Sequence, residues 1–221
     1  MVSEIFATSA AWSRAVIEFA DGLDPWARTA AQWGTDLFLG VFAFLFLMAW
    51  WRARSAGSRL VGLALLAPVA TVIAYFASVT VKSFFQQLRP CQAMTDLNTI
   101  ATCDPVGDWS FPSNHAAVAG AAAAAVIIAW RRFAVAAVLF AALEAFSRVL
   151  VGVHYPHDVT VGLLVGAAVA TLVCLLAARP MTFLVDRLAE NDRLRPLLRA
   201  RAAPGPGPEI EQIREKAHSS A

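Results

Sequence analysis

The stretch LVGLALLAPVATVIAYFASVTV, residues Leu60–Val81, contains no charged side chain and decides the class of fold. The hydrocarbon core of a bilayer is about 30 Å thick, and a helix needs roughly 20 apolar residues to cross it. Leu60–Val81 meets that length, and so does Val159–Ala178. Both stretches therefore predict transmembrane helices.

Three further stretches are shorter or less uniform, and we expect them to be spans as well. Ser113–Trp130 and Phe133–Leu150 are separated only by Arg131 and Arg132, and Trp33–Trp51 is rich in aromatic side chains. The sequence therefore predicts an all-α fold, a polytopic transmembrane helical bundle of five to six spans.

The composition agrees with a membrane protein. Of the 221 residues, 58% are hydrophobic and only 15% are charged, which is too apolar for an ordinary soluble domain. Glu4 interrupts what would be the apolar core of a signal peptide, so we expect no cleavable signal. Cys91, Cys103 and Cys174 lack the paired spacing of a zinc ribbon or a thioredoxin-like motif.

Residues 1–32 form a separate N-terminal segment. Trp12, Val16, Phe19 and Leu23 repeat every three or four residues, with charged residues between them. This period is typical of an amphipathic helix that lies in the membrane interface. A tilted or partial first span is the alternative, because short apolar runs are ambiguous.

Arginine residues indicate which side of the membrane each loop faces. They gather at Arg52–Arg59, at Arg131–Arg132 and from Arg179 onward. If the spans alternate, all three groups lie on one side, and positive loops mark the cytoplasm. Segments 82–112 and 151–157 then face outward, and the C-terminus is cytoplasmic.

Residues 33–178 are expected to form the transmembrane domain, and residues 179–221 a cytoplasmic tail that is partly disordered. The tail is charged and contains Pro204-Gly-Pro-Gly-Pro208, which is typical of a flexible linker. A tail that binds anionic lipid is the alternative to a solvated one.

Polar residues cluster at three span ends on the outward side, and the first cluster contains Lys82 and Arg89. Their separation of seven residues is close to two helical turns, which would place both on one helix face. Pro90 ends that helix, because the residue before a proline is disfavoured in helical geometry. Two cations on one face suit a phosphate group, although such side chains at span ends also snorkel toward the interface.

The second cluster is Phe111-Pro112-Ser113-Asn114-His115. Ser113 is expected to cap a helix, and His115 falls in its first turn. A helix N-terminus offers unpaired N–H groups and a positive dipole end, which together favour an anion. Capping alone, with His115 as an interfacial polar residue, is the alternative.

The third cluster begins at Arg148 and ends with His154, His157 and Asp158. A carboxylate that accepts a proton from one imidazole nitrogen fixes the tautomer and raises the basicity of the other nitrogen. We expect Asp158 to act in this way and to make His154 a nucleophile. His157 is expected to be a spectator, because adjacent residues on a helix point in different directions.

Taken in order, Lys-x6-Arg-Pro, Pro-Ser-x-His and Ser-Arg-x5-His-x3-Asp resemble the signature of the type 2 phosphatidic acid phosphatase superfamily, over about residues 60–178. The resemblance implies a helical bundle and metal-independent hydrolysis, so no metal or other cofactor is expected. It implies that His154 is the nucleophile, Asp158 its orienting partner and His115 the general acid. The residues implied to hold the phosphoryl oxygens are Lys82, Arg89, Ser113, Asn114 and Arg148.

Asn114 stands where the family usually has glycine. The backbone N–H is retained, and asparagine tolerates positive φ better than most residues, so we expect activity to be kept. The polar residue, the short chain and the reduced N-terminal region are similar to bacterial undecaprenyl pyrophosphate phosphatases.

The resemblance thus implies a plasma-membrane phosphatase whose extracytoplasmic site converts a polyprenyl diphosphate to the monophosphate. Phosphatidate, phosphatidylglycerol phosphate and a polyprenyl-linked phosphosugar are alternative substrates, since the signature contacts the phosphate and not the lipid tail. A soluble vanadate haloperoxidase, a transporter and an inactive lipid-binding scaffold agree less well, because the chain is apolar, lacks repeated halves and keeps all three catalytic residue types. The expected partners are the phosphorylated lipid and the bilayer, with no nucleic acid. The sequence indicates no oligomeric state.

The signature gives no role to four further residues, which are Glu144, Cys91, Cys103 and Cys174. Glu144 either pairs with Arg148 across one helical turn or is a simple interface carboxylate. Cys91 and Cys103 either form a disulfide in an oxidising compartment or stay free. Cys174 is expected to be packed in the last span.

Overall fold

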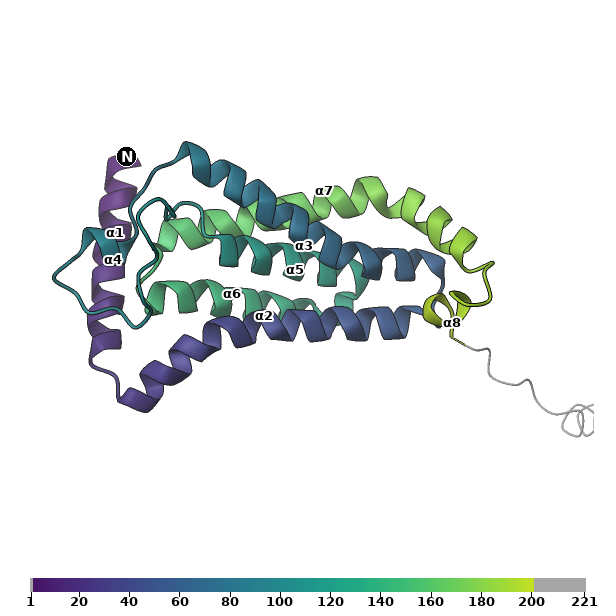
Figure 1. The fold of residues 1–221 in the computed structure, drawn as a ribbon, viewed down its shortest axis with the longest axis horizontal. Helices are drawn as coiled ribbons and strands as arrows, with labels where there is room; N and C mark the ends of the chain where they lie inside the picture. Colours follow the sequence, from purple (N-terminus) through teal and green to yellow (C-terminus); the bar gives the residue numbers. More distant parts are fainter. Residues whose placement is uncertain (1, 201–221) are drawn as a thin grey trace, which may run out of the picture.

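A computed structural model describes residues 2–200, and the regular structure of that range is helical. The helices that run side by side along the long axis are α2 (Pro25–Ala53), α3 (Ser58–Phe84), α5 (Asn114–Ala129), α6 (Ala134–Leu150) and α7 (Pro156–Leu188) (Figure 1). The short elements are α4 (Pro90–Ala93), the 3-10 turn η1 (Arg131–Phe133) and α8 (Arg195–Leu198). The predicted all-α bundle is confirmed.

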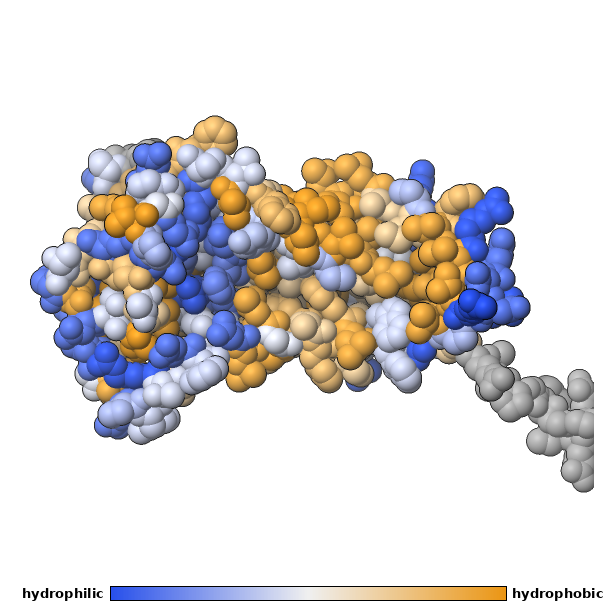
Figure 2. Space-filling model, in the orientation of Figure 1, coloured by the Kyte–Doolittle hydropathy of each residue, from blue (hydrophilic) through white to orange (hydrophobic). Residues whose placement is uncertain are grey.

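Four stretches are long and apolar enough to cross a membrane, namely α2, α3, η1 with α6, and α7. The fifth predicted span, α5, has 16 residues and extends only about 24 Å. It lies at the centre of the bundle, where it packs mainly against α7 and α3. Figure 2 shows hydrophobic side chains over the middle of the molecule, between hydrophilic ends, as a membrane protein requires.

Small residues let the backbones of α5 and α7 touch. A Cβ atom built on Gly166 would lie 1.9 Å from the carbonyl oxygen of Ala117, and one on Gly120 would lie 2.2 Å from the carbonyl oxygen of Leu163. Only hydrogen fits at these distances, so both glycines are needed for this packing.

The last helix is longer than the hydropathy pattern predicts. The predicted span ends at Ala178, whereas α7 continues through Arg179 and Pro180 to Leu188. Its final turns pack against α2 and α3, with Val185 completely buried. A tertiary contact therefore extends the helix beyond the point at which charges begin. The predicted linker at 204–208 lies outside the described residues.

The N-terminal helix α1 (Val2–Asp21) lies across one end of the bundle (Figure 1) and is not among the described helices that are apolar enough to span a membrane. Trp12 and Phe19 of the predicted stripe are both 65% exposed, and the helix ends before Leu23. The residues buried against the bundle are Ser9, Ser13, Ile17 and Ala20. Ile17 and three small side chains thus pack α1 onto the bundle, while Trp12 and Phe19 stay exposed.

The three arginine groups meet at the end of the bundle opposite to α1. The Arg52 guanidinium lies 5.7 Å from the ring centroid of Trp130, which precedes η1. The carbonyl of Arg54 accepts a hydrogen bond of 2.9 Å from the N–H of Ala200. The α2–α3 loop, the α5–α6 connection and the segment after α7 are therefore neighbours, as alternating spans predict.

Replacing Gly166 by alanine should lower the thermal midpoint of the detergent-purified protein, because the new methyl group collides with the Ala117 carbonyl. Overpacking of this kind destabilises by about 1–3 kcal/mol. Gly40→Ala is the matched control, because its Cβ would meet no described atom within 4 Å. Equal midpoints for the two variants would contradict the close approach.

Candidate active site

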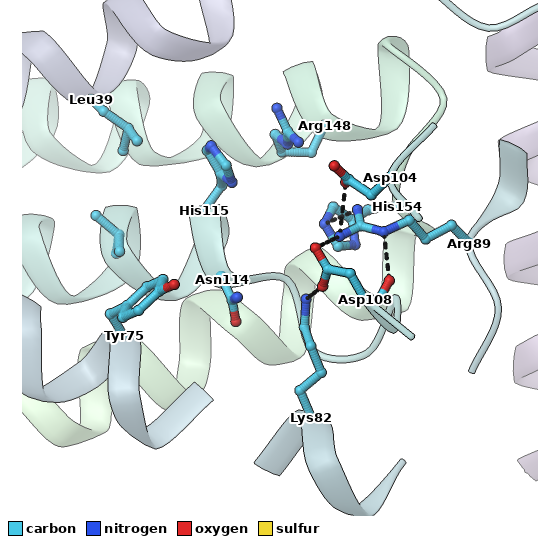
Figure 3. A pocket seen from close by; sticks show the side chains of 11 residues that line it. Leu39, Tyr75, Lys82, Arg89, Asp104, Asp108, Asn114, His115, Arg148 and His154 are labelled. Atoms are coloured by element: carbon cyan, nitrogen blue, oxygen red, sulfur yellow. Dashed lines mark hydrogen bonds and ion pairs between the residues drawn. The ribbon is translucent and has the colours of Figure 1, made fainter. Parts of the chain in front are cut away.

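A cavity of about 320 Å³ lies where the C-terminal ends of α3 and α6 meet the N-terminal end of α5. The predicted site residues that line it are Lys82, Arg89, Asn114, His115, Arg148 and His154 (Figure 3). Ser113 and Asp158 are completely buried and are not among the residues that line the cavity. Ser113 caps α5, with its hydroxyl oxygen 3.4 Å from the N–H of Ala116. The structure thus brings all three sequence clusters to one place.

Lys82 and Arg89 converge on the carboxylate of Asp108 (Figure 3). Lys82 Nζ lies 3.0 Å from Asp108 Oδ1, and Arg89 Nη2 lies 3.0 Å from Asp108 Oδ2. Arg89 also pairs with Asp104, at 3.1 Å from Nη2 to Oδ2. Both cations are nearly buried, with 6% of Lys82 and 3% of Arg89 exposed. Neither aspartate was expected from the sequence, because only the folded loop places them here.

The prediction that the two cations share a helix face is wrong. Helix α3 ends at Phe84, and Phe85 is extended, with φ −120° and ψ 95°. Arg89 is also extended, with φ −70° and ψ 154°, as expected for a residue before Pro90. Arg89 therefore enters the site from a loop, and the shared anion rather than helical spacing brings the cations together.

His154 is contacted at both ring nitrogens. Its Nε2 lies 3.2 Å from Arg89 Nη1, and a guanidinium can only donate, so Nε2 holds a lone pair. Its Nδ1 lies 3.4 Å from Ser110 Oγ and 3.5 Å from Asp158 Oδ2, so these partners favour the proton on Nδ1. Burial lowers the pKa of His154 to about 4, which leaves the ring neutral at neutral pH.

Ser110 is a further site residue that the sequence motifs did not indicate. Its buried hydroxyl donates a hydrogen bond of 2.5 Å to Asp158 Oδ2. With that proton committed, the Ser110 oxygen is free to accept from His154 Nδ1. The only signal in the sequence is its position two residues before Pro112, and a lone serine has no spacing that predicts a role.

Asp158 lies close to both neighbouring histidines, although only His154 was expected to have it as a partner. Oδ2 accepts a hydrogen bond of 2.9 Å from the Tyr155 N–H, and Oδ1 lies 3.0 Å from His157 Nε2. That second approach is not aligned as a hydrogen bond, and Oδ1 has none among the described residues. His154 precedes the first turn of α7, so helical periodicity does not set its direction.

His157 joins the site to α1 rather than lining the cavity. Its Nδ1 lies 2.7 Å from Ser9 Oγ, and its Nε2 contacts the side-chain amide of Gln87. The ring stacks on Tyr155, with 5.3 Å between centroids. These contacts indicate a structural role.

Arg148, His115 and Asn114 complete the cavity wall. Figure 3 shows Arg148 and His115 side by side, on the far side of the cavity from Lys82. Asn114 Oδ1 accepts a hydrogen bond of 2.9 Å from Ser78 Oγ. Asn114 begins α5 with an ordinary negative φ, since glycines alone have positive φ in the described range, so the expected tolerance of positive φ is not used.

The ion pair predicted as one alternative for Glu144 does not form. Glu144 is completely buried, and neither of its carboxylate oxygens has a hydrogen-bond partner within residues 2–200. Arg148 instead lines the cavity. Glu144 is therefore neither an exposed interface carboxylate nor a direct partner of Arg148.

A disulfide joins Cys91 and Cys103, so that the segment next to Arg89 is tied to the segment that holds Asp104. Cys174 is a buried free thiol in α7, as expected. Within the part of the chain that the structure describes, no group of three or more His, Cys, Asp or Glu side chains is arranged to hold a metal ion.

Comparison with known proteins identifies relatives that act on phosphorylated lipids. The undecaprenyl-diphosphatase BcrC of Bacillus subtilis is 30% identical over 159 residues, which is 71% of this chain and 79% of that protein. The decaprenylphosphoryl-5-phosphoribose phosphatase of Mycobacterium tuberculosis is 33% identical over 49% of this chain and 58% of its own length. A lipid A 1-phosphatase of Rhizobium johnstonii is 41% identical, over 32% of this chain and only 29% of that protein.

Solved structures show the same fold. A PAP2-type phosphatidylglycerolphosphate phosphatase from Bacillus subtilis matches with a TM-score of 0.59 at 19% identity, covering 80% of this chain and 87% of that one. LpxE of Aquifex aeolicus matches with a TM-score of 0.53 at 24% identity, covering 74% and 92%. A family model described as the PAP2 superfamily matches residues 63–181, more than half of the sequence. The chain therefore belongs to the PAP2 superfamily, whose members include membrane phosphatases.

Proposed function

We propose that this protein is an integral membrane lipid phosphatase that converts a polyprenyl diphosphate of the undecaprenyl type to the monophosphate. The observation that supports this best is the meeting of three cations, Lys82, Arg89 and Arg148, with two histidines around one cavity. Cations of this kind stabilise the equatorial oxygens of a phosphoryl group in transfer. A neutral imidazole beside them supplies a nucleophile.

The first step forms a phosphohistidine. Nε2 of His154 attacks the terminal phosphorus, and the bond from phosphorus to the leaving oxygen breaks. The Nδ1 proton of His154 stays between Ser110 and Asp158, whose negative charge stabilises the positive charge that develops on the ring. His115, on the cavity wall, protonates the leaving oxygen.

The second step releases phosphate. Water attacks the phosphorus and gives a proton to His115, and the bond between phosphorus and His154 Nε2 breaks. The imidazole returns to its neutral form with its lone pair on Nε2. In this scheme the backbone N–H groups at the start of α5, beside Asn114, bind the phosphoryl oxygens.

The substrate class follows from the relatives and the cavity together. Among the three relatives matched by sequence above, the undecaprenyl-diphosphatase BcrC is aligned over the greatest share of this chain, 71%. Leu39, Tyr75 and Val118 add apolar lining beside the phosphate-binding residues, where the first carbons of a lipid would lie. Lipid A 1-phosphate, phosphatidylglycerol phosphate and a polyprenyl-linked phosphosugar present a similar terminal phosphate and are the alternatives.

We propose that the cavity faces the outside of the plasma membrane. It lies at the end of the bundle opposite to the arginine groups, which mark the cytoplasmic side. The C-terminus then lies in the cytoplasm. A cysteine-labelling reagent that cannot cross the membrane should modify a cysteine introduced at Val106, which is 78% exposed, in intact cells.

The proposed function is tested by phosphate release from undecaprenyl diphosphate in detergent with EDTA present. Wild-type protein should be active, and His154→Ala should lose about 10³-fold or more, because the nucleophile is removed. His157→Gln is the matched control and should keep most activity, since this ring does not line the cavity. Full turnover by His154→Ala would refute the phosphohistidine mechanism.

His115→Ala should damage monoester hydrolysis more than diphosphate hydrolysis. The leaving group of a diphosphate is itself a phosphate, which departs without much help from an acid. The measurement is kcat on a lipid monophosphate and on a lipid diphosphate with the same tail. Equal losses on the two substrates would show that His115 is not the general acid.

Ser110→Ala should lower kcat about 10- to 100-fold with little change in KM, because the Ser110 hydroxyl contacts Asp158 and His154 and not the substrate. Ser110→Thr keeps the hydroxyl and should restore most of the rate. A raised KM with unchanged kcat would instead place Ser110 in substrate binding.

A further inference from the structure

The cavity already contains an anion supplied by the chain itself. Asp108 presents its two carboxylate oxygens to two cations, one at 3.0 Å from Lys82 and the other at 3.0 Å from Arg89. A phosphate group would approach the same two cations with two of its oxygens. Asp104 adds a second carboxylate at 3.1 Å from Arg89. Two of the three cations are thus neutralised before any substrate enters.

We infer that Asp108 is an internal anion that competes with the substrate phosphate for Lys82 and Arg89. The inference rests on the proposed function for the class of ligand, a phosphate group at the end of a lipid. Substrate binds only when the Asp108 carboxylate leaves both cations. The apparent dissociation constant of a phosphate ligand therefore exceeds that of the open site, by the inverse of the fraction of protein that is open.

The carboxylate is the most exposed of the three partners, although Arg89 Nε also donates a hydrogen bond of 2.9 Å to the backbone carbonyl of Asp108. The side chain of Asp108 is 47% exposed, whereas those of Lys82 and Arg89 are only 8% and 4% exposed. Asp108 follows Gly107, whose φ of +110° is readily adopted by glycine. The cations are therefore fixed by the bundle and its loops, and the anion lies at the solvent side of the cavity.

The Asp108 carboxylate stays charged, as a competitor must. Burial acts to raise the pKa of Asp108, but the contacts with Lys82 and Arg89 outweigh it and hold that pKa below its usual value. The Cys91–Cys103 disulfide keeps the loop close, because Cys103 adjoins Asp104 and Cys91 lies two residues after Arg89. A displaced Asp108 side chain therefore remains beside the cavity and can return when phosphate leaves.

The test measures binding of inorganic phosphate and of inorganic pyrophosphate to the purified full-length protein by calorimetry. Asp108→Asn keeps the size of the side chain and removes its charge, so phosphate should bind roughly tenfold more tightly. The gain should be larger for pyrophosphate, because the removed charge also repels the more highly charged ligand. Asp104→Asn should give a smaller gain, since Arg89 keeps Asp108.

Asp96→Asn is the matched control. Asp96 belongs to the same loop but pairs with Arg14 at 2.7 Å, away from the cavity lining. Its removal should leave phosphate binding unchanged. An equal gain in this variant would mean that net charge, and not the contact in the cavity, sets the affinity, and it would overturn the inference.

Unchanged or weaker phosphate binding by folded Asp108→Asn would also overturn the inference, because Asp108 would then hold the cations in place for substrate. If that variant does not fold, Asp104→Asn decides, and the absence of any gain refutes the competition. Lipid turnover is measured separately with wild-type protein. Failure to hydrolyse any lipid phosphate would refute the proposed function, while the phosphate dissociation constants would still decide the role of Asp108.

Discussion

Three cations gathered at one end of an apolar bundle repel one another, and the architecture of the site follows from that constraint. Removing charge from water costs free energy that only a close counter-charge offsets. Asp108 and Asp104 supply this counter-charge for Lys82 and Arg89. Arg148 has no such partner at its buried Nε among the described residues. Under the proposed function, an incoming phosphate would gain Arg148 as a new partner and would take over the other two cations from the carboxylates.

The same site depends on how closely two helices approach. A Cβ on Gly162 would lie 2.6 Å from the carbonyl oxygen of Ser113, so α7 touches α5 close to the first turns of both helices. The Ser113 N–H donates a hydrogen bond of 3.1 Å to the Asp158 carbonyl. Glycines of α7 thus bring the start of α5, with His115, beside the start of α7, with Asp158. The close packing of these two helices therefore also sets the geometry of the cavity.

Local sequence patterns predict the features of this protein that depend on interactions between residues close in the sequence. Hydropathy predicts the bundle helices, and the motif spacing predicts which side chains meet in the cavity. The patterns do not predict Ser110 and Asp108, because a loop serine and a loop aspartate are placed only by the folded chain. The expectation that Arg89 shares a helix face with Lys82 failed because α3 ends at Phe84. Each difference arises where tertiary contact replaces helical periodicity.

In the proposed phosphohistidine mechanism, the environment of His154 has two opposing effects on its reactivity. Burial lowers its pKa, which keeps the lone pair on Nε2 available but also makes that nitrogen a weaker base. Asp158 acts in the opposite direction, because its charge stabilises the positive ring that forms when Nε2 bonds to phosphorus. A buried carboxylate is itself costly, and Ser110 and the Tyr155 N–H offset that cost by hydrogen bonding to Oδ2. The hydroxyl of Ser110 is therefore part of what allows a charged Asp158 to lie beside a neutral imidazole.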